Sequence, residues 1–329
     1  MTVTVKDVAQ QCGVDPAVVC KVLNARLPEI DGETRDRVLE AAERLGYPGG
    51  AHTPNLGVLY ADESGRGLTH PFFVLILNAF KAVAEARGYD MTFIHPGSGE
   101  NVSYEKRCLE AGVDGVCLVC MDFRAPQIKA LAQSGIPCVS VDHIFKGMPA
   151  VLSDNETGVE KLVEYAVSRG HRRIAFIHGH NNSIVTRTRI NQFYNTMTYR
   201  GLTVPPEYVR EGLYDDIELT RKIVIELLKL PERPTCILLP DDISYLGAQD
   251  AARDLGLRVP QDVSFAGYDG IPLTQMLTPR LTTIRQSSDD IGRMAARKLI
   301  DLIERPEGTS RKPSVFPVQL VEGGTIEAI

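Results

Sequence analysis

The residue types that most often carry catalysis or bind metals are present, but they do not form a catalytic set. His178 and His180 lie two apart and could share one strand face, yet no third ligand follows at a suitable spacing. Cys117 and Cys120 form a CxxC pair within GVCLVC, which predicts a buried strand on which residues three apart face opposite ways. We find no nucleophile–base pair, and no GxGxxG follows a predicted strand. The sequence therefore predicts a binding protein that is not an enzyme and needs no metal or cofactor.

Two aspartates directly follow apolar stretches and are better placed for ligand binding. Asp241 follows TCILLP (235–240), and Asp269 ends VSFAGYD (263–269). Open α/β sheets bind ligands at the carboxyl ends of their strands, where carboxylates accept hydrogen bonds from hydroxyls. We place Arg189 at the start of a helix after a polar loop, and its charged fork suits a ring hydroxyl or a carboxylate. An alternative is that Asp241 and Asp242 simply cap a helix.

The elements that carry these residues alternate between short apolar runs and amphipathic helices. This alternation predicts a parallel sheet covered by helices on both faces, repeated in two similar lobes with a ligand crevice. We expect strands at 55–61, 90–96, 114–120, 137–142, 172–179, 235–240 and 263–269. We expect helices at 72–89, 102–113, 125–135, 157–170, 189–201, 217–230, 245–256 and 287–304.

The N-terminal stretch 4–24 has a different pattern. Thr4 and Asp7 have the spacing of a helix-opening capping box, Gly13 permits a sharp turn, and Asp15 and Pro16 suit the start of a second helix. Two short helices joined by such a turn are typical of the helix-turn-helix, whose second helix enters the DNA major groove. A third amphipathic helix follows at 32–47, and we expect it to turn Val38, Leu39, Ala42 and Leu45 inward.

Composition limits the possible compartments and partners. The chain of 329 residues has a net charge of −6 and seven cysteines, an odd number that suits reduced thiols better than disulfides. The sequence shows no membrane span or signal peptide, so we expect a cytoplasmic protein without a membrane partner. The first 50 residues hold six Lys and Arg against eight Asp and Glu. Any DNA binding must therefore depend on the placement of few cations and be modest at physiological salt.

The pattern of the first 47 residues resembles the LacI/GalR (lactose-repressor) family of bacterial transcription regulators. The matching positions are Thr4, Asp7, Val8, Ala9, Gly13, Val14, Val19, Val22, Leu23, Asn24, Glu33, Thr34, Arg35, Arg37, Val38, Leu45, Gly46 and Tyr47. DNETG (154–158), GHRRIAFI (170–177), GLRVPQDVSFAGYD (256–269) and PRLTTIRQ (279–286) extend the resemblance over nearly the whole chain.

The resemblance implies a fold and its boundaries. The fold is α/β, with a three-helix helix-turn-helix head at 1–47 followed by two doubly wound lobes of the periplasmic-binding-protein-like type at 56–329. The first lobe spans about 56–153 and 286–312, and the second about 156–283 and 315–329, with crossings near Ser153–Asn155, Thr283–Gln286 and Lys312–Val315. Residues 48–55 form a short linker that lacks the family's hinge-helix pattern, so the family's minor-groove wedge is not expected here.

The resemblance also implies DNA contacts and an effector. In the head it assigns DNA contacts to Thr4, Asp15, Pro16, Ala17, Cys20, Lys21 and Asn24. Pro16 and Ala17 can offer only apolar contact, and Lys21 replaces the family's usual Arg, so one alternative is a degenerate head without specific DNA binding.

In the crevice the resemblance assigns effector binding to Phe72, Phe73, Asp142, Arg189, Asp241 and Asp269. From its position in the chain, we place His180 at the edge of the cleft. Aromatic rings cover apolar sugar faces while carboxylates accept from hydroxyls, so the set favours a sugar. We therefore expect a homodimeric, sugar-responsive repressor of carbohydrate-utilisation genes that binds operator DNA. The alternative is a cytosolic sugar-sensing or solute-binding protein whose head has lost specific DNA binding.

Overall fold

The computed structural model describes residues 3–23, 30–47, 54–60, 68–95 and 103–329. Two units emerge, an N-terminal head and a much larger domain that begins at Leu56. Most of the linker predicted at 48–55, and residues 61–67 of the loop before α4, lie outside the described residues. Among the described residues, no helix has the length and apolar character needed to cross a bilayer.

The head contains three helices, α1 (Val5–Cys12), α2 (Pro16–Leu23) and α3 (Gly32–Leu45). The predicted capping box is confirmed, because the Thr4 amide donates to the Asp7 carboxylate at 2.7 Å and the Asp7 amide donates back to the Thr4 hydroxyl at 3.4 Å. Gly13 ends α1 in the left-handed region, with φ of 65°. The turn that separates α1 from α2 therefore follows from local sequence alone.

A small apolar core holds the three helices of the head together. Val8, Val19 and Val38 contribute one fully buried side chain from each helix. The prediction for α3 is wrong at one position, because Leu39 is 42 % exposed and Ala41 is buried in its place. The other three predicted positions, Val38, Ala42 and Leu45, lie in or against the core of the head as expected.

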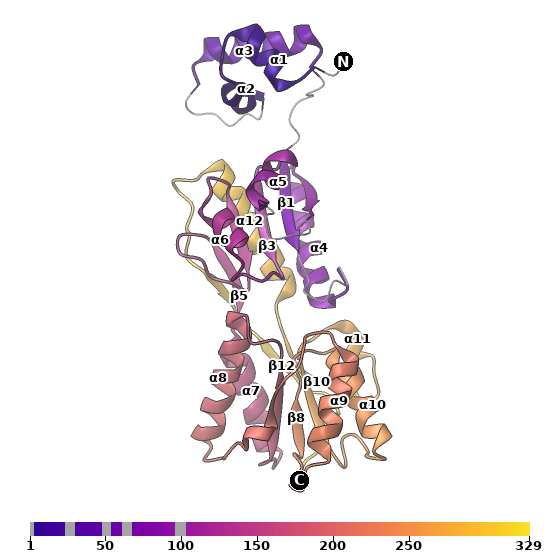
Figure 1. Cartoon of the computed structure of the whole chain (residues 1–329). Coiled ribbons are helices and arrows are strands. Elements are labelled where there is room, and N and C mark those ends of the chain that lie inside the picture. The colour runs from indigo at the N-terminus through magenta and orange to yellow at the C-terminus, as the bar shows by residue number, and fades with distance from the viewer. Residues whose placement is uncertain (1–2, 24–29, 48–53, 61–67, 96–102) are drawn as a thin grey trace. The chain divides into compact units, whose positions relative to one another are not determined.

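The larger domain contains two six-stranded sheets, each wound into one lobe (Figure 1). The first sheet has the order β11-β5-β4-β3-β1-β2, formed by β1 (Asn55–Tyr60), β2 (Asp90–Ile94), β3 (Gly115–Val119), β4 (Cys138–Val141), β5 (Ala150–Ser153) and β11 (Ser314–Phe316). The second has the order β12-β10-β9-β8-β6-β7, formed by β6 (Ile174–His178), β7 (Val209–Glu211), β8 (Cys236–Leu238), β9 (Ser264–Asp269), β10 (Thr282–Arg285) and β12 (Gln319–Val321). The predicted doubly wound architecture is thereby confirmed.

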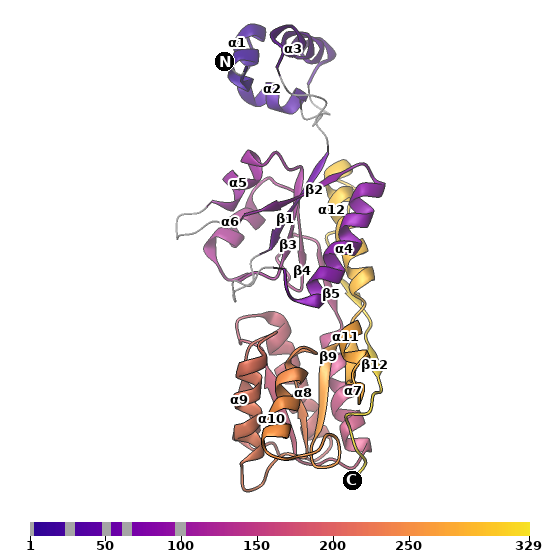
Figure 2. The same ribbon diagram turned by 90° about the vertical axis from the view of Figure 1, so that its right-hand side faces the viewer.

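Helices cover both faces of each sheet, which explains why strands such as β3 are apolar throughout. In the first lobe, α4 and α12 lie on one face and α5 and α6 on the other (Figure 2). Their bounds are α4 (Pro71–Ala86), α5 (Tyr104–Glu110), α6 (Pro126–Gln133) and α12 (Ser288–Glu304). A Cβ at Gly292 would lie 2.1 Å from the carbonyl oxygen of Ile76, so only glycine allows α12 to approach α4 this closely.

The second lobe has two apolar cores, one on each side of its sheet. One core joins the sheet to α9 and α10 through residues such as Val224 and Ala248. The other joins it to α7 and α8 through residues such as Val163 and Phe193. The helices of this lobe are α7 (Asn155–Ser168), α8 (Ile184–Tyr199), α9 (Ile217–Leu228), α10 (Ser244–Asp254) and α11 (Pro272–Gln275), with a 3₁₀ turn at Pro206–Tyr208.

The chain passes between the lobes at three points. The first passage lies between β5, which ends at Ser153, and α7, which begins at Asn155. The second lies after β10 ends at Arg285, slightly later than the predicted 283–286. The third was predicted at 312–315 and lies instead between β11 and β12, because Ser314–Phe316 pairs with β5 in the first sheet.

Several short elements were not predicted. They are β5, β7, β10, β11, β12 and α11, each of three or four residues. The helix predicted at 189–201 begins at Ile184, five residues earlier, because the Ser183 hydroxyl accepts from the Thr186 amide and caps it. Arg189 therefore lies within the helix and not at its start.

Candidate functional site

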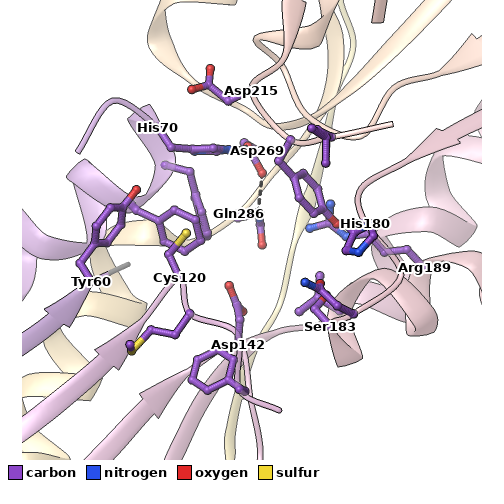
Figure 3. Close-up of a pocket in the computed structure, with 18 residues that line it drawn as sticks. Tyr60, His70, Cys120, Asp142, His180, Ser183, Arg189, Asp215, Asp269 and Gln286 are labelled. Atoms are coloured by element: carbon purple, nitrogen blue, oxygen red, sulfur yellow. Dashed lines mark hydrogen bonds and ion pairs between the residues drawn. The ribbon is translucent and has the colours of Figure 1, made fainter. Parts of the chain in front are cut away.

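A cavity of about 370 Å³ lies between the two lobes (Figure 3). Its volume is in the range of small-molecule sites. Its walls are mainly apolar and aromatic, with a few charged side chains. The lining residues are Tyr60, His70, Phe72, Phe73, Cys120, Met121, Phe123, Asp142, His180, Asn182, Ser183, Val185, Arg189, Leu213, Tyr214, Asp215, Asp269 and Gln286.

Unusual backbone conformations concentrate at this cavity. Within the described ranges, the non-glycine residues with positive φ are Cys120 (51°), Asp142 (62°), Asp215 (56°) and Asp269 (116°). All four line the cavity. Such conformations cost on the order of 1–3 kcal/mol each and cluster at functional sites, where the surrounding structure must hold them. Three of the four are aspartates, so these strained positions place carboxylates at the cavity wall.

Arg189 is the buried cation of the cavity, only 5 % exposed. Its Nε donates to the Asn155 side chain at 2.8 Å, and its Nη1 donates to the Pro240 carbonyl at 3.2 Å. The guanidinium lies 3.5 Å from the centre of the Tyr268 ring, a cation–π contact. The orientation of this side chain is therefore determined before any ligand enters.

Asp269 is the last residue of β9 and faces the same cavity. One of its carboxylate oxygens accepts a hydrogen bond from the side-chain amide of Gln286 at 2.6 Å. The other lies 3.9 Å from Nε2 of His70, a residue of the first lobe. Burial raises the pKa of Asp269 well above its ordinary value, although the charge of Arg189 opposes this. Asp269 is thus a partly satisfied carboxylate at the point where the lobes meet.

Asp142 follows β4 in the first lobe, and its carboxylate points into the cavity (Figure 3). Its Oδ1 is buried and has no hydrogen-bond partner among the described residues. Burial raises the pKa of Asp142 to about 6, against the opposing charge of Arg189. A buried acceptor of this kind is a position at which a ligand donor gains a strong hydrogen bond.

Asp241 was predicted to bind the effector, but it is not among the lining residues. Its carboxylate accepts from the Asp215 amide at 2.7 Å, the Ser244 amide at 2.8 Å and the Ser244 hydroxyl at 3.1 Å. The neighbouring Asp242 accepts from Ile271 and Thr274 at 2.9 and 2.8 Å. The structure therefore corrects the assignment for Asp241, and both aspartates have structural roles as hydrogen-bond acceptors.

Aromatic side chains form the wall on the side of the first lobe. Phe72 and Phe73 lie in the first turn of α4, which Pro71 opens. Their rings are 5.3 Å apart, and His70 lies 5.2 Å from Phe73. His180, at the second lobe, pairs with Glu211 at 2.8 Å and is half exposed, consistent with the predicted cleft edge.

The cavity thus brings together five of the six residues predicted to bind the effector, Phe72, Phe73, Asp142, Arg189 and Asp269. Among the lining residues that sequence reasoning missed are His70, Tyr214, Asp215 and Gln286. Tyr214 and Asp215 follow β7, a strand too short to predict. Gln286 ends PRLTTIRQ, and the family match of this stretch was the one signal that could have pointed to it.

The surface predicted to contact DNA is described only in part. Thr4, Asp15 and Pro16 are exposed on the head. Asn24 and the side chains of Ala17, Cys20 and Lys21 lie outside the described residues. In the part of the chain that the structure describes, no group of three or more His, Cys, Asp or Glu could hold a metal ion.

A helix-turn-helix head followed by a two-lobed α/β domain with an interlobe cavity defines the class of ligand-responsive DNA-binding regulators. Comparison with known families agrees: residues 4–49 match the model of bacterial regulatory proteins of the lacI family, and residues 163–326 match a periplasmic binding protein-like domain. The chain belongs to the LacI family, whose members are DNA-binding transcription regulators.

One relative is the transcriptional repressor PurR from Pectobacterium carotovorum, which is 30 % identical over 95 % of this chain and 94 % of that protein. Another is the "Probable HTH-type transcriptional repressor ExuR" from Bacillus subtilis, which is 29 % identical over 94 % of both chains. A solved structure of the lac repressor dimer bound to operator and an anti-inducer has 25 % identity, covers both chains fully and gives a TM-score of 0.72. The resemblance seen in the sequence is therefore confirmed.

Proposed function

We propose that this regulator binds a sugar or related polyol in the interlobe cavity and, as a homodimer, represses carbohydrate-utilisation genes from a palindromic operator. The observation that carries the effector assignment is the convergence of Asp142, Asp269 and Arg189 on a cavity walled by Phe72 and Phe73. Carboxylates accept from hydroxyls, a guanidinium donates to ring oxygens, and aromatic rings cover the C–H faces of a sugar.

For the DNA-binding part, we take residues 1–47 as the head, 48–55 as the linker and 56–329 as the effector domain. The packed core of the head supports this division, because Val8, Val19 and Val38 hold the two helices of the motif on the third. The relative with the operator complex is a dimer, which supports two heads on one palindromic site. We assign Thr4, Asp15, Pro16, Ala17, Cys20, Lys21 and Asn24 to the DNA-facing surface.

For the cavity, we propose binding without catalysis. Ser183 is a potential nucleophile on the wall, but its hydroxyl donates to Thr186 and accepts from the Thr186 amide, both at 3.0 Å. His180 is engaged with Glu211. We therefore assign the Ser183 hydroxyl to capping a helix and His180 to closing a loop, and neither to the activation of a nucleophile.

The test of the DNA-binding assignment is selection of bound sequences from a random DNA library by the full-length protein, followed by salt titration on the selected site. We expect a palindromic consensus with at least a hundredfold preference over unrelated DNA, in the range of specific repressors. Binding without any consensus would contradict the proposal and favour a sensing protein with a degenerate head. Addition of sugars to the preformed complex then tests for effector response.

A further inference from the structure

The charges around the cavity are unequal. Among the described lining residues, the three carboxylates of Asp142, Asp215 and Asp269 face one guanidinium, that of Arg189. Of the two lining histidines, His180 is already paired with Glu211 at 2.8 Å. The Nε2 atom of His70 lies 3.9 Å from the Asp269 carboxylate. The described wall of the site is therefore acidic, although the cavity is largely apolar.

The one guanidinium is already engaged in internal contacts. Arg189 donates to Asn155 and to the Pro240 carbonyl, and it stacks on Tyr268 at 3.5 Å. A carboxylate or phosphate on a ligand could use only its remaining N–H groups, and it would do so beside three carboxylates. Like charges brought together in a site that excludes water repel one another and weaken binding. The site is therefore unfavourable for an anion.

Among the three carboxylates, the one with an unsatisfied hydrogen-bonding atom is Asp142, although the charge of Arg189 also acts on it. Asp269 accepts from Gln286 at 2.6 Å and faces His70, while Asp215 accepts from the Thr69 hydroxyl at 3.4 Å. Asp142 Oδ1, by contrast, is buried without a hydrogen-bond partner among the described residues. Its carboxylate points into the cavity between the two lobes (Figure 3). A ligand that fills this space displaces the water that would otherwise solvate the charge.

We propose that the effector carries a protonated amine, as an amino sugar does, and that this ammonium binds against Asp142, so that the site rejects sugar acids and sugar phosphates. The inference deepens the proposed sugar effector and depends on it. An ammonium supplies the hydrogen bond that the buried carboxylate oxygen lacks, and its positive charge suits the acidic wall. The nearby aromatic rings of Phe72, Phe73 and Phe123 are also suitable neighbours for a cation.

A neutral sugar could also donate a hydroxyl to Asp142, and a hydroxyl donor likewise favours the ionised carboxylate. The two cases therefore differ in the charge of the ligand. Matched amino, neutral and acidic sugars separate them.

The experiment is isothermal titration of the full-length protein at pH 7.5 with two matched series: glucosamine, glucose and glucuronate, and galactosamine, galactose and galacturonate. We expect the amino sugar of at least one series to bind at least about tenfold more tightly than its neutral partner, and the sugar acids to give no binding. Asp142→Asn should reduce this preference to about one. Glu207→Gln, which changes an exposed acid at the Pro206–Tyr208 turn in the same way, should preserve it.

Three results would overturn the inference. Equal or tighter binding of a neutral sugar or a sugar acid would remove the charge preference while leaving the sugar effector intact. An unchanged preference in Asp142→Asn, with the variant folded by circular dichroism, would show that the amine does not bind at this carboxylate. Silence of all six ligands would overturn this inference, while the addition of other sugars to the preformed DNA complex tests the sugar effector of the proposed function separately.

Discussion

The Asp241 carboxylate accepts a hydrogen bond from the backbone amide of Asp215 at 2.7 Å. Asp215 lines the cavity with a positive φ of 56°, and Asp241 does not line it. Asp241 therefore acts on the site through a neighbour 26 residues earlier in the chain. The acidic residue at the end of β8 positions part of the cavity wall, where the sequence pattern indicated direct ligand contact.

Replacement of Asp241 should affect stability and binding together. Asp241→Ala leaves the amides of Asp215 and Ser244 without their acceptor, which should lower the free energy of unfolding by roughly 2–4 kcal/mol, since each unsatisfied buried donor costs about 1–3 kcal/mol. Asp241→Asn keeps one acceptor oxygen but turns its NH₂ donor toward the other amide, and should cost less than Asp241→Ala. Urea unfolding measures both values. Equal losses in the two variants would show that these hydrogen bonds do not explain the role of Asp241.

Arg189 should be needed both for effector binding and for the stability of the two-lobed domain. Arg189→Ala should abolish effector binding while basal DNA binding persists, because the head is a separate unit with its own core. It also leaves buried carboxylates uncompensated, so we expect a loss of stability of about 3–5 kcal/mol. Arg189→Lys keeps the charge but loses the fork and the stacking on Tyr268, and should restore stability more than binding. Titration of effector and operator separately, with thermal unfolding, checks each part; normal effector affinity in Arg189→Ala would contradict the assignment.

Asp142 should make the stability of the ligand-free protein depend on pH. Burial raises its pKa to about 6 from an ordinary value of 3.8. A raised carboxyl pKa contributes stability below about pH 4 that is lost as the pH rises through about 6. The variant Asp142→Asn lacks this loss, so its stability relative to the wild type should increase between pH 4 and pH 7, by at most about 3 kcal/mol. Denaturation at a series of pH values measures the difference, and a constant difference across this window would refute the prediction.

Lys21 should contribute to sequence recognition in the head. It lies on α2, the second helix of the helix-turn-helix, and we place it on the base-reading face. Lys21→Ala should weaken binding to the selected site by roughly tenfold or more, in line with the loss of one base contact at about 1–3 kcal/mol, and weaken non-specific binding less. Lys222→Ala, which removes an exposed lysine from α9 of the second lobe, is the control and should change neither. An equal loss on both kinds of DNA would assign Lys21 to a phosphate contact.

Local patterns in the sequence were sufficient for the head and for most of the α/β elements. The capping box of Thr4 and Asp7 and the turn at Gly13 involve residues close in the chain, so their spacing predicts them directly. The buried strands β3 and β9 appear as apolar runs because helices cover both faces of their sheets. Even so, the apolar spacing did not predict every inward position of α3, because packing buries Ala41 and leaves Leu39 exposed.

The site depended on contacts that no local pattern contains. The hydroxyl of Thr69 meets Asp215, 146 residues further on, and His70 faces Asp269 across the lobes. Asp241 and Asp269 both follow apolar strands, yet only Asp269 reaches the cavity, because the Asp215 and Ser244 amides hold the Asp241 carboxylate. The sequence alone was enough to identify the family, the two-lobed fold and the edge of the sheet where a ligand binds. Which side chains meet there was decided by the crossings between the lobes, since these bring distant strand ends to one cavity.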